Sequence, residues 1–530
     1  MGRSVAILSL LPNLGCRKVQ LPLKVDAHEK VTLQSQIFEQ IRRMILDGRL
    51  RSGDFLPTTR ALSEQIGISR NTTLMAYERL MAEGYIQTRP SVGTFVSAEI
   101  PETTFVTKSS LLSANVEDAD ASGHADFPEP HLEHLRAHAI VNPHANPLVA
   151  DFWVGRPSPD SFPLKIWSNL IWRRLATAGK VLTEYGDPAG LYELRLAIAD
   201  HLGPTRGVTT DPEQIIVVGG AQDGLNLVGR MLLGPGSTAV VESPCYQGAA
   251  YLLESFGAEL HPVPVYEKGL EVEKLPEVDG AVAYVTPSHQ YPFGVTLTLD
   301  RRISLLSWAT RLRGYIIEDD YDSDFRFAGS PITALKGLDR GERVFYIGTF
   351  SKCMGPALRL GYVVVPRAFT KPAKILKALM NNGQPWLEQA AMADFMNSGG
   401  YARHLRRLRQ IYLARRNATL ASLKRHFGES DVIGADAGMH LVWRLPGHLP
   451  SASDVQAMAL AAGVGVYTLN SGAAHHFDSS EESERFLVLG YAALTESEIE
   501  LGISRLSSTL MPSGSINGHS EKSFLRGMVA

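Results

Sequence analysis

Apolar residues in the first hundred positions recur three times at helical spacing. The pattern predicts helices over residues 33–46, 60–66 and 70–83, each ended by a turn that contains glycine or a polar residue. In the third helix we expect Leu74, Tyr77, Leu80 and Met81 to face the core. Residues 85–89 and 93–97 then alternate like two strands around Pro90-Ser91, which predicts a β-hairpin.

Two of these helices have the layout of a helix-turn-helix, and the hairpin is placed as a wing. Gly67 lies in the turn, and Ser69 is suited to cap the recognition helix. The first turn of such a helix must offer donors and acceptors to base edges and phosphates, and Arg70, Asn71 and Thr73 supply them. Residues 33–97 hold eight arginines against six acidic residues. Since that excess is small, the position of the charges carries the argument.

The segment GDFLPTTRALSEQIGISRNTTLMAYERLMAEGYIQTRPSVGTFV resembles the DNA-binding domain of the GntR family. The resemblance implies a double-stranded operator in promoter DNA as partner. It implies that Arg60 and Arg70 contact the DNA, with Asn71, Thr72 and the wing residue Gly93 close to its backbone.

Beyond residue 148, short β-rich runs alternate with helix-length stretches. The predicted strands cover residues 215–218, 238–242, 280–286, 315–318 and 344–347. This rhythm predicts an α/β domain with a mostly parallel sheet and helices on both faces. Because functional groups in such sheets collect at the carboxyl ends of the strands, the residues that follow each strand matter most.

Three of the predicted strands are followed by residues of unusual chemical character. Small residues at 219–224 expose backbone N–H groups that suit a phosphate, although a tight turn alone explains them equally well. Three acids at 318–320 near a core need a positive partner, such as a protonated pyridine nitrogen. Burial makes the amine of Lys352 nucleophilic and suited to forming an imine with an aldehyde. The neighbouring Thr349, Ser351 and Arg359 suit a phosphate.

Together the three motifs resemble the fold-type I aminotransferases over about residues 150–510. The resemblance implies pyridoxal 5′-phosphate as cofactor, with Lys352 forming the internal aldimine, Asp319 on the ring nitrogen and Tyr321 on the ring hydroxyl. It further implies that Tyr246 stacks on the ring, and that Tyr185 reaches the phosphate of the neighbouring subunit in a head-to-tail homodimer. The residues it implies around the phosphate of the chain's own site are Gly220, Ala221, Thr349, Ser351 and Arg359.

One segment departs from ordinary aminotransferases. Where they carry Asn-Pro-x-Gly, this chain has Tyr291-Pro292-Phe293-Gly294, so the usual asparagine near the ring hydroxyl is absent. His289 or Ser288 is the expected substitute, with a purely structural histidine as the alternative. For the arginine that grips an effector carboxylate, the candidate is Arg485.

The order of the domains, with TPSHQYPFG, IEDDYDSDFRF, GTFSK and HLRRLRQIYLARR, resembles the MocR subfamily of GntR regulators. We expect an N-terminal extension (1–30), a winged helix-turn-helix domain (31–97), a linker (98–148), an aminotransferase-like domain (149–511) and a disordered tail (512–530). A length of 530 residues agrees with several domains.

Composition narrows the remaining classes. The three cysteines form no CxxC pair, which argues against a disulfide framework or a cysteine-rich metal site; we expect no metal and a reducing cytoplasm. No apolar run approaches the ~20 residues of a membrane-spanning helix, so no membrane partner is expected. The net charge of −3 is a whole-chain average, which does not exclude a nucleic-acid contact by one small domain.

Three functions fit the sequence. The favoured one is a transcription regulator whose large domain senses a ligand at Lys352, either pyridoxal phosphate itself, as in a PdxR-like vitamin B6 regulator, or a small amino compound. The second is a working aminotransferase acting on an amino acid, and residual transaminase half-reactions fit even a regulator. The third is a DNA-binding repressor whose large domain only dimerises, which would predict a degenerate lysine site.

Overall fold

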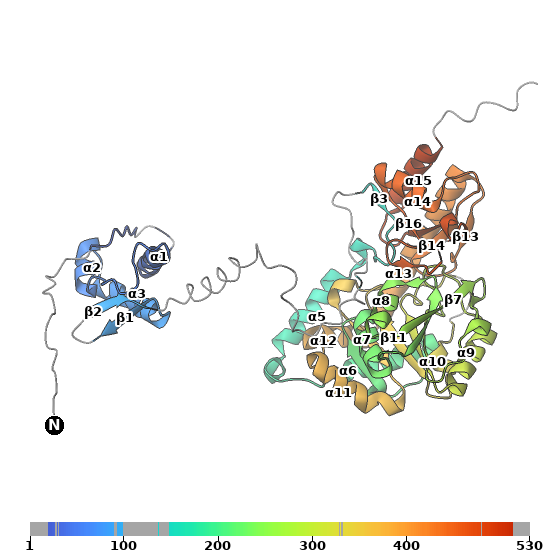
Figure 1. Cartoon of the computed structure of the whole chain (residues 1–530), viewed down its shortest axis with the longest axis horizontal. Helices are drawn as coiled ribbons and strands as arrows, with labels where there is room; N and C mark the ends of the chain where they lie inside the picture. Colours follow the sequence, from blue (N-terminus) through green and yellow to red (C-terminus); the bar gives the residue numbers. More distant parts are fainter. Residues whose placement is uncertain are drawn as a thin grey trace, which may run out of the picture. The chain divides into compact units, whose positions relative to one another are not determined.

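The computed structural model describes residues 20–26, 29, 31–89, 93–98, 136, 148–327, 329, 332–478 and 480–511. The chain divides into two compact units, residues 1–130 and 131–530, which have separate hydrophobic cores (Figure 1). The Pro90-Ser91 turn, the tail 512–530, the first nineteen residues and most of the expected linker lie outside the described residues. No helix in the described part of the chain is both long and apolar enough to span a bilayer.

The first unit is the predicted winged helix-turn-helix. Its elements are α1 (Leu33–Leu46), α2 (Thr59–Ile66), α3 (Arg70–Ala82), β1 (Ile86–Arg89) and β2 (Gly93–Val96). Each helix begins after a hydroxyl side chain that accepts a backbone N–H of the first turn: Thr32, Thr58 and Ser69. Gly67 ends α2 in the left-handed region with φ 68°, which glycine adopts without strain. The strands β1 and β2 pair antiparallel.

The buried face of α3 differs from the predicted one. The buried positions are Thr73, Ala76, Tyr77 and Leu80, whereas Leu74 and Met81 are 40% and 37% exposed. Positions 73, 76, 77 and 80 follow the i, i+3, i+4, i+7 stripe by which the helix packs on both α1 and α2. The predicted DNA contact by Thr73 is therefore wrong, because its side chain belongs to the core.

The first unit also begins earlier than predicted. Leu21 is only 2% exposed and packs in the core of the winged helix. Gln65 of α2 donates its side-chain amide to the Leu21 carbonyl at 2.5 Å. Residues from Leu21 are thus part of the folded unit rather than of an extension that ends at residue 30.

The second unit is built on an eight-stranded sheet of order β4-β12-β11-β10-β9-β5-β7-β8. The five strands from β11 to β7 pair in parallel, whereas β12 lies antiparallel between β11 and β4, and β8 lies antiparallel to β7. The mostly parallel sheet that the sequence predicts is confirmed. The strands are β4 (Ile215–Val218), β5 (Thr238–Ser243), β7 (Glu259–Tyr266), β8 (Gly269–Leu270), β9 (Val282–Val285), β10 (Tyr315–Asp320), β11 (Val344–Thr349) and β12 (Gly361–Val364).

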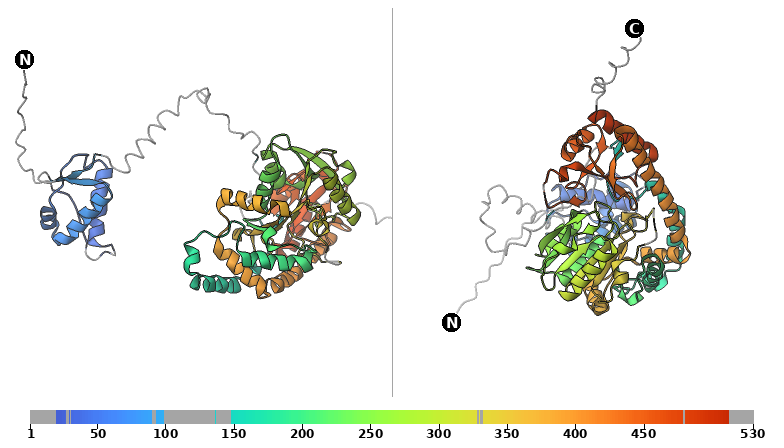
Figure 2. Two further views of the ribbon diagram at one scale, coloured as in Figure 1. Left: turned by 90° about the horizontal axis from the view of Figure 1, so that it is seen from below. Right: turned by 90° about the vertical axis from the view of Figure 1, so that its right-hand side faces the viewer.

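Helices surround this sheet, and a smaller lobe follows it. The surrounding helices are α5 (Leu164–Ala176), α6 (Tyr192–Arg206), α7 (Ala221–Leu232), α8 (Gln247–Ser255), α9 (Leu299–Arg311), α10 (Leu335–Leu338), α11 (Thr370–Asn381) and α12 (Trp386–Asn397). The long α13 (Gly400–Phe427) runs along both lobes (Figure 2, right). The C-terminal lobe contains β13 (Asp431–Ile433), β14 (His440–Arg444), α14 (Ala452–Ala461), β15 (Val464–Gly465), β16 (Tyr467–Thr468), β18 (Phe486–Gly490) and α15 (Glu496–Leu510).

The segment that enters the second unit packs on the C-terminal lobe. Its short strand β3 (Ala150–Asp151) pairs with β15 of the C-terminal lobe. The backbone N–H of Gly490, at the end of β18, donates to the Phe152 carbonyl at 2.8 Å. Gly155, three residues further on, therefore reaches the carboxyl edge of the large sheet.

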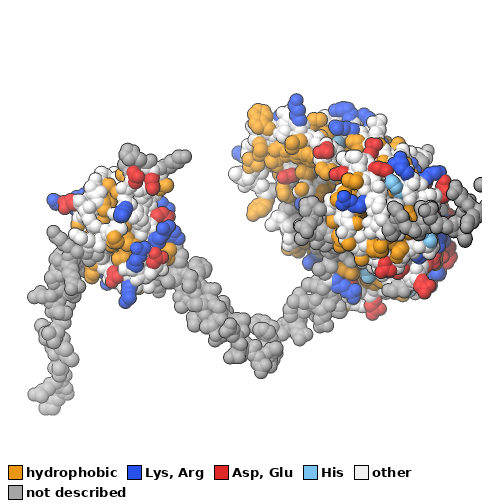
Figure 3. All heavy atoms as spheres, turned by 90° about the horizontal axis from the view of Figure 1, so that it is seen from above, with side chains coloured by type: hydrophobic (Ala, Val, Ile, Leu, Met, Phe, Trp, Pro, Cys, Tyr) orange, Lys and Arg blue, Asp and Glu red, His pale blue; other side chains and the backbone are white. Residues whose placement is uncertain are grey.

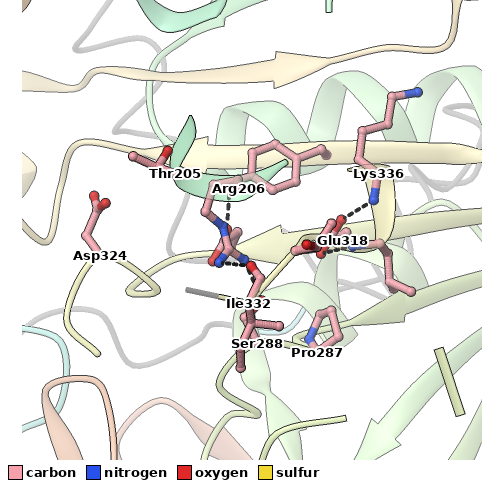
Figure 4. Close-up of polar contacts among 12 residues, drawn as sticks. Thr205, Arg206, Pro287, Ser288, Glu318, Asp324, Ile332 and Lys336 are labelled. Carbon is pink, nitrogen blue, oxygen red and sulfur yellow. Dashed lines mark hydrogen bonds and ion pairs between the residues drawn. The ribbon is translucent and has the colours of Figure 1, made fainter. Parts of the chain in front are cut away.

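A buried ion pair between Arg206 and Asp320 lies at the same edge of the sheet. The guanidinium of Arg206, at the end of α6, contacts the Asp320 carboxylate at 2.7 Å, the Ile332 carbonyl at 2.7 Å and the Ser288 hydroxyl at 2.6 Å (Figure 4). The neighbouring Glu318 carboxylate accepts the backbone N–H groups of Leu335 and Lys336. Both acids are thereby satisfied within the core, which leaves only Asp319 of the predicted acidic triplet to face the site.

Candidate functional site

Lys352 lies in the turn that follows β11, at the carboxyl edge of the sheet. Its Nζ donates to the Gly155 carbonyl at 3.1 Å, and a Cβ at Gly155 would lie 2.5 Å from Nζ, so a side chain at that position would displace the amine. Burial lowers the pKa of the Lys352 amine, while Asp322 and Asp319 oppose that shift. A buried amine with a lowered pKa is a better nucleophile than an ordinary surface lysine.

Asp319 lies near the end of β10, and its side chain points into the site. Its Oδ2 accepts the Tyr284 phenol at 2.9 Å, whereas its Oδ1 is buried and has no hydrogen-bond partner in the described structure. Burial raises the pKa of Asp319 to about 7, so this carboxyl group holds a proton more readily than an ordinary aspartate. An orphaned carboxyl oxygen of this kind fits a basic ring nitrogen, to which Asp319 can deliver its proton.

Tyr321, directly after β10, contacts a buried histidine–aspartate pair. The Nδ1 atom of His289 lies 3.1 Å from the Tyr321 hydroxyl and 2.9 Å from Asp322 Oδ2. Burial lowers the pKa of His289, but the charge and hydrogen bond of Asp322 outweigh burial, so that this pKa lies above its usual value. The ring of His440, from β14, lies tilted against that of His289 with centroids 5.0 Å apart, and its Nε2 donates to the Pro292 carbonyl at 2.8 Å. Of the two predicted substitutes for the asparagine, His289 is the one that lies beside Tyr321.

A phosphate-sized set of donors gathers at the start of α7. Gly220 is the N-cap of that helix with φ 100°, and Ala221 is its first residue. The Arg359 guanidinium lies against this helix start, since a Cβ at Gly220 would be 3.3 Å from its Nη1. Thr349 and Ser351, in the turn before Lys352, bond to each other at 3.0 Å. A helix N-terminus, an arginine and two hydroxyls together suit a phosphate dianion.

The predicted stacking residue borders the same site. Tyr246 closes the short strand β6 (Cys245–Tyr246), and its hydroxyl donates to Gln222 Oε1 of α7 at 3.4 Å. Its ring lies 6.2 Å from that of Tyr291, which in turn lies 6.0 Å from Tyr321. The three tyrosine rings thus extend from the start of α7 to the His289–Asp322 pair.

Two predicted residues are placed where they cannot act as expected. Arg485 directly precedes β18, at the end of the strand opposite to Gly490. The antiparallel pairing places His440 opposite Gly490 and Arg444 opposite Phe486, so Arg485 lies at the other end of the strand pair from His440. Its guanidinium donates to the carbonyls of Leu445, Pro446, Leu449 and Pro450. The assignment of Arg485 to an effector carboxylate is therefore wrong. The Ser288 hydroxyl is taken by Arg206, so Ser288 does not replace the asparagine.

Residues that the sequence interpretation missed complete the site. They are Gly155, Tyr284, Gln222 and Asp322, described above. Tyr284 did leave a signal, because a tyrosine inside the continuous apolar run of β9 needs a partner for its hydroxyl. Gly155 left none, since its contact with Lys352 joins positions 197 apart in sequence.

The residues expected at DNA lie on the surface of the first unit, apart from partly buried Thr72 and Gly93. Arg70 and Asn71 are exposed in the first turn of α3, and the Thr72 hydroxyl is within 2.8 Å of the Ser69 cap. Gly93 begins the second wing strand. Arg60 is exposed on α2, where it pairs with Glu64 at 3.0 Å. Tyr185, expected at a neighbouring subunit, is 92% exposed and makes no described contact with its own chain's site.

Comparison with known proteins agrees with both units. Residues 33–96 match the model of bacterial regulatory proteins of the gntR family, and residues 162–506 match that of class I and II aminotransferases. The chain is 35% identical to the probable rhizopine catabolism regulatory protein MocR of Rhizobium meliloti, over 92% of this chain and 96% of that protein. The chain belongs to the gntR family, in the MocR type that carries an aminotransferase domain.

Further relatives cover each part of this MocR-type regulator. The pyridoxine biosynthesis transcriptional regulator PdxR of Corynebacterium glutamicum is 33% identical over 75% of this chain and 80% of that protein. Among solved structures, the kynurenine aminotransferase of Pyrococcus horikoshii, in complex with PMP, superposes with a TM-score of 0.62 and 26% identity, covering 69% of this chain and 91% of that one. The chain is a pyridoxal phosphate-dependent, DNA-binding transcription regulator.

The site of this MocR-type regulator fits that cofactor. Asp319, with its unpartnered Oδ1, would hold the ring nitrogen, Tyr321 and His289 would hold the ring hydroxyl, and Tyr246 would cover the ring face. The backbone at the start of α7, together with Arg359, Thr349 and Ser351, would hold the phosphate. When bound, the cofactor supplies an aldehyde that reacts with amines, and its pyridine ring withdraws electrons from the carbon so attached.

Proposed function

We propose that the second unit senses a ligand at Lys352, and that occupancy changes how the chain binds its operator. The ligand is either pyridoxal phosphate, whose aldehyde would condense with the lysine amine with loss of water, or a small amino compound, which would displace that amine from the cofactor. The observation that carries this proposal is a buried, nucleophilic amine in the same chain as a helix-turn-helix. The names of the relatives connect such regulators with pyridoxine biosynthesis and with rhizopine catabolism. We place this activity in the cytoplasm, where promoter DNA and reduced thiols occur together.

Operator binding in the presence of candidate effectors tests the proposal. With promoter DNA held fixed, we expect pyridoxal phosphate or an amine to shift the apparent affinity by 5- to 150-fold, the usual range of coupling between two sites. The shift must disappear in Lys352→Ala, which keeps the DNA-binding unit. An effector that leaves DNA affinity unchanged in the wild-type chain would exclude ligand sensing.

An aminotransferase is the second candidate, because the site retains the lysine and its partners. Lys352, Asp319 and Tyr321 all occupy the carboxyl edge of the sheet. Arg485 is fixed on backbone carbonyls and cannot hold a substrate carboxylate, which removes one expected element of substrate binding. Steady accumulation of a keto product from an amino acid, without an effect on DNA, would favour this candidate.

Arg70→Ala should weaken operator binding by roughly 1–3 kcal/mol, or about 5- to 150-fold, because an exposed arginine in the first turn of α3 is placed to read a base. A fluorescence anisotropy titration at physiological salt measures the change. The matched control is Arg311→Ala, which removes the same charge from an exposed ion pair with Glu277 in the second unit. Equal affinities for Arg70→Ala and the wild type would reject the base contact.

We propose that the chain forms a head-to-tail homodimer through the face that contains α5. Large apolar side chains are exposed along this helix and the segment after it: Leu164, Ile166, Trp172, Leu175, Leu182 and Tyr185. In Figure 3, hydrophobic side chains gather on the left of the large unit, the side on which Figure 1 shows α5. A contiguous apolar patch of this kind is typical of an interface. In such a dimer, Tyr185 of each copy would reach the site of the other copy.

Trp172→Glu should convert the dimer to monomer, because a charge would be buried at the centre of the apolar face. Light scattering coupled to size-exclusion chromatography distinguishes the two masses. Leu501→Glu is the control, since Leu501 is 49% exposed on α15 of the other lobe. A Trp172→Glu protein that remains dimeric would place the interface elsewhere.

A further inference from the structure

A pocket away from Lys352 contains an arginine from the segment that leads into the second unit. Arg136 lies beside Tyr251, Glu254, His475 and Phe477, which line a pocket of about 450 Å³. We call these four residues the aromatic box. The Arg136 guanidinium is 5.5 Å from the centre of the Tyr251 ring, and its Nε is 3.1 Å from Glu254 Oε2.

The chemistry of the aromatic box matches a guanidinium. The rings of Tyr251, His475 and Phe477 form a chain, with centroids 5.4 and 4.5 Å apart. Ring faces attract a planar cation, and Glu254 supplies the opposite charge with one-quarter of its side chain exposed. Burial and the nearby Arg136 charge lower the pKa of His475, so this ring stays neutral and does not repel the arginine. A surface ion pair alone contributes little, but here it is joined to an aromatic wall.

We propose that the aromatic box is a guanidinium site that docks the chain's own interdomain segment through Arg136. The occupant is this arginine because it already lies against both the ring and the carboxylate. Docking fixes the point from which the chain leaves the second unit toward the winged helix.

The two elements that carry the aromatic box, α8 and the segment that begins with β17, both contact Tyr246, which borders the cofactor site. Helix α8 begins directly after Tyr246 and carries Tyr251 and Glu254, three residues apart on one face. The strand β17 (Ala474–His475) pairs with β6 so that Ala474 lies opposite Tyr246. A shift of Tyr246 on cofactor binding would therefore move the walls that hold Arg136. This coupling, unlike the docking itself, rests on the proposed function.

Cleavage by an arginine-specific protease at the Arg136–Ala137 bond of the full-length chain tests the docking, with fragments identified by mass spectrometry. Glu254→Gln and Tyr251→Ala should each speed this cleavage by about fivefold, because each removes one of the two contacts of the guanidinium. The control is Glu259→Gln, which removes an exposed carboxylate from the same pocket. Equal rates in all four proteins, or the same acceleration in the control, would overturn the proposal.

A second arm separates the docking from its coupling to the cofactor. Saturating pyridoxal phosphate should change the rate of cleavage at Arg136 in the wild-type chain and not in Lys352→Ala. If the visible absorbance band of the bound cofactor forms and the cleavage rate stays constant, the coupling is rejected while docking stands. If the band itself does not form, the proposed function fails, and the comparison among the box variants still decides the docking.

Discussion

Lys352→Ala should abolish the visible absorbance that pyridoxal phosphate acquires when it is attached to the wild-type chain. The Lys352 amine is the group at the sheet edge that burial has made nucleophilic, and it is held over the site by the Gly155 carbonyl. An alanine cannot attach the aldehyde, so the loss is expected to be complete. A spectrum recorded after removal of free cofactor measures it, with hydride reduction and peptide mapping to locate the modified lysine.

A second buried lysine provides the matched control. Lys377 on α11 is fully buried and has a pKa that burial lowers, yet its amine is paired with Asp223 at 2.6 Å. Lys377→Arg keeps that ion pair and should leave the absorbance band in place. A Lys352→Ala protein that retains the band, or a band lost in Lys377→Arg alone, would move the attachment site away from Lys352.

Residues that follow a strand were predictable because their position depends only on local sequence. Asp319, Lys352 and Gly220 each lie at the end of a predicted strand or in the turn that follows it, and such ends meet at one edge of the sheet. The antiparallel β12 was missed, since nothing in its residues distinguishes it from another apolar run. Its insertion between β4 and β11 brings Gly220 and Arg359 together.

The wrong assignments share a different physical origin. Arg485 and Ser288 were chosen by their spacing from a motif, but hydrogen-bond partners from distant segments decide where such polar side chains point. In α3 the apolar residues Leu74 and Met81 lie outside the core while Thr73 lies within it, because two neighbouring helices fix which face is covered. The spacing of apolar residues predicts that a segment is helical, but which face of the helix is buried depends on the elements packed against it.

Asp319→Asn should weaken the binding of pyridoxal phosphate by about 3 kcal/mol, or ~100-fold, because it leaves a buried ring nitrogen without its carboxylate partner. The asparagine keeps the size of the side chain and its place beside Tyr284, so the fold is retained. Equilibrium titration of the cofactor-free protein, followed by absorbance, measures the dissociation constant.

Tyr284→Phe separates the charge of Asp319 from its positioning. This change removes one hydrogen bond to Oδ2 and leaves the carboxylate in place, so a loss of about 1 kcal/mol is expected. The order of affinities should be wild type, then Tyr284→Phe, then Asp319→Asn. Equal losses in the two variants would mean that Asp319 acts only as a hydrogen-bond partner of Tyr284, and the ring nitrogen would then need another acid among the residues that line the site.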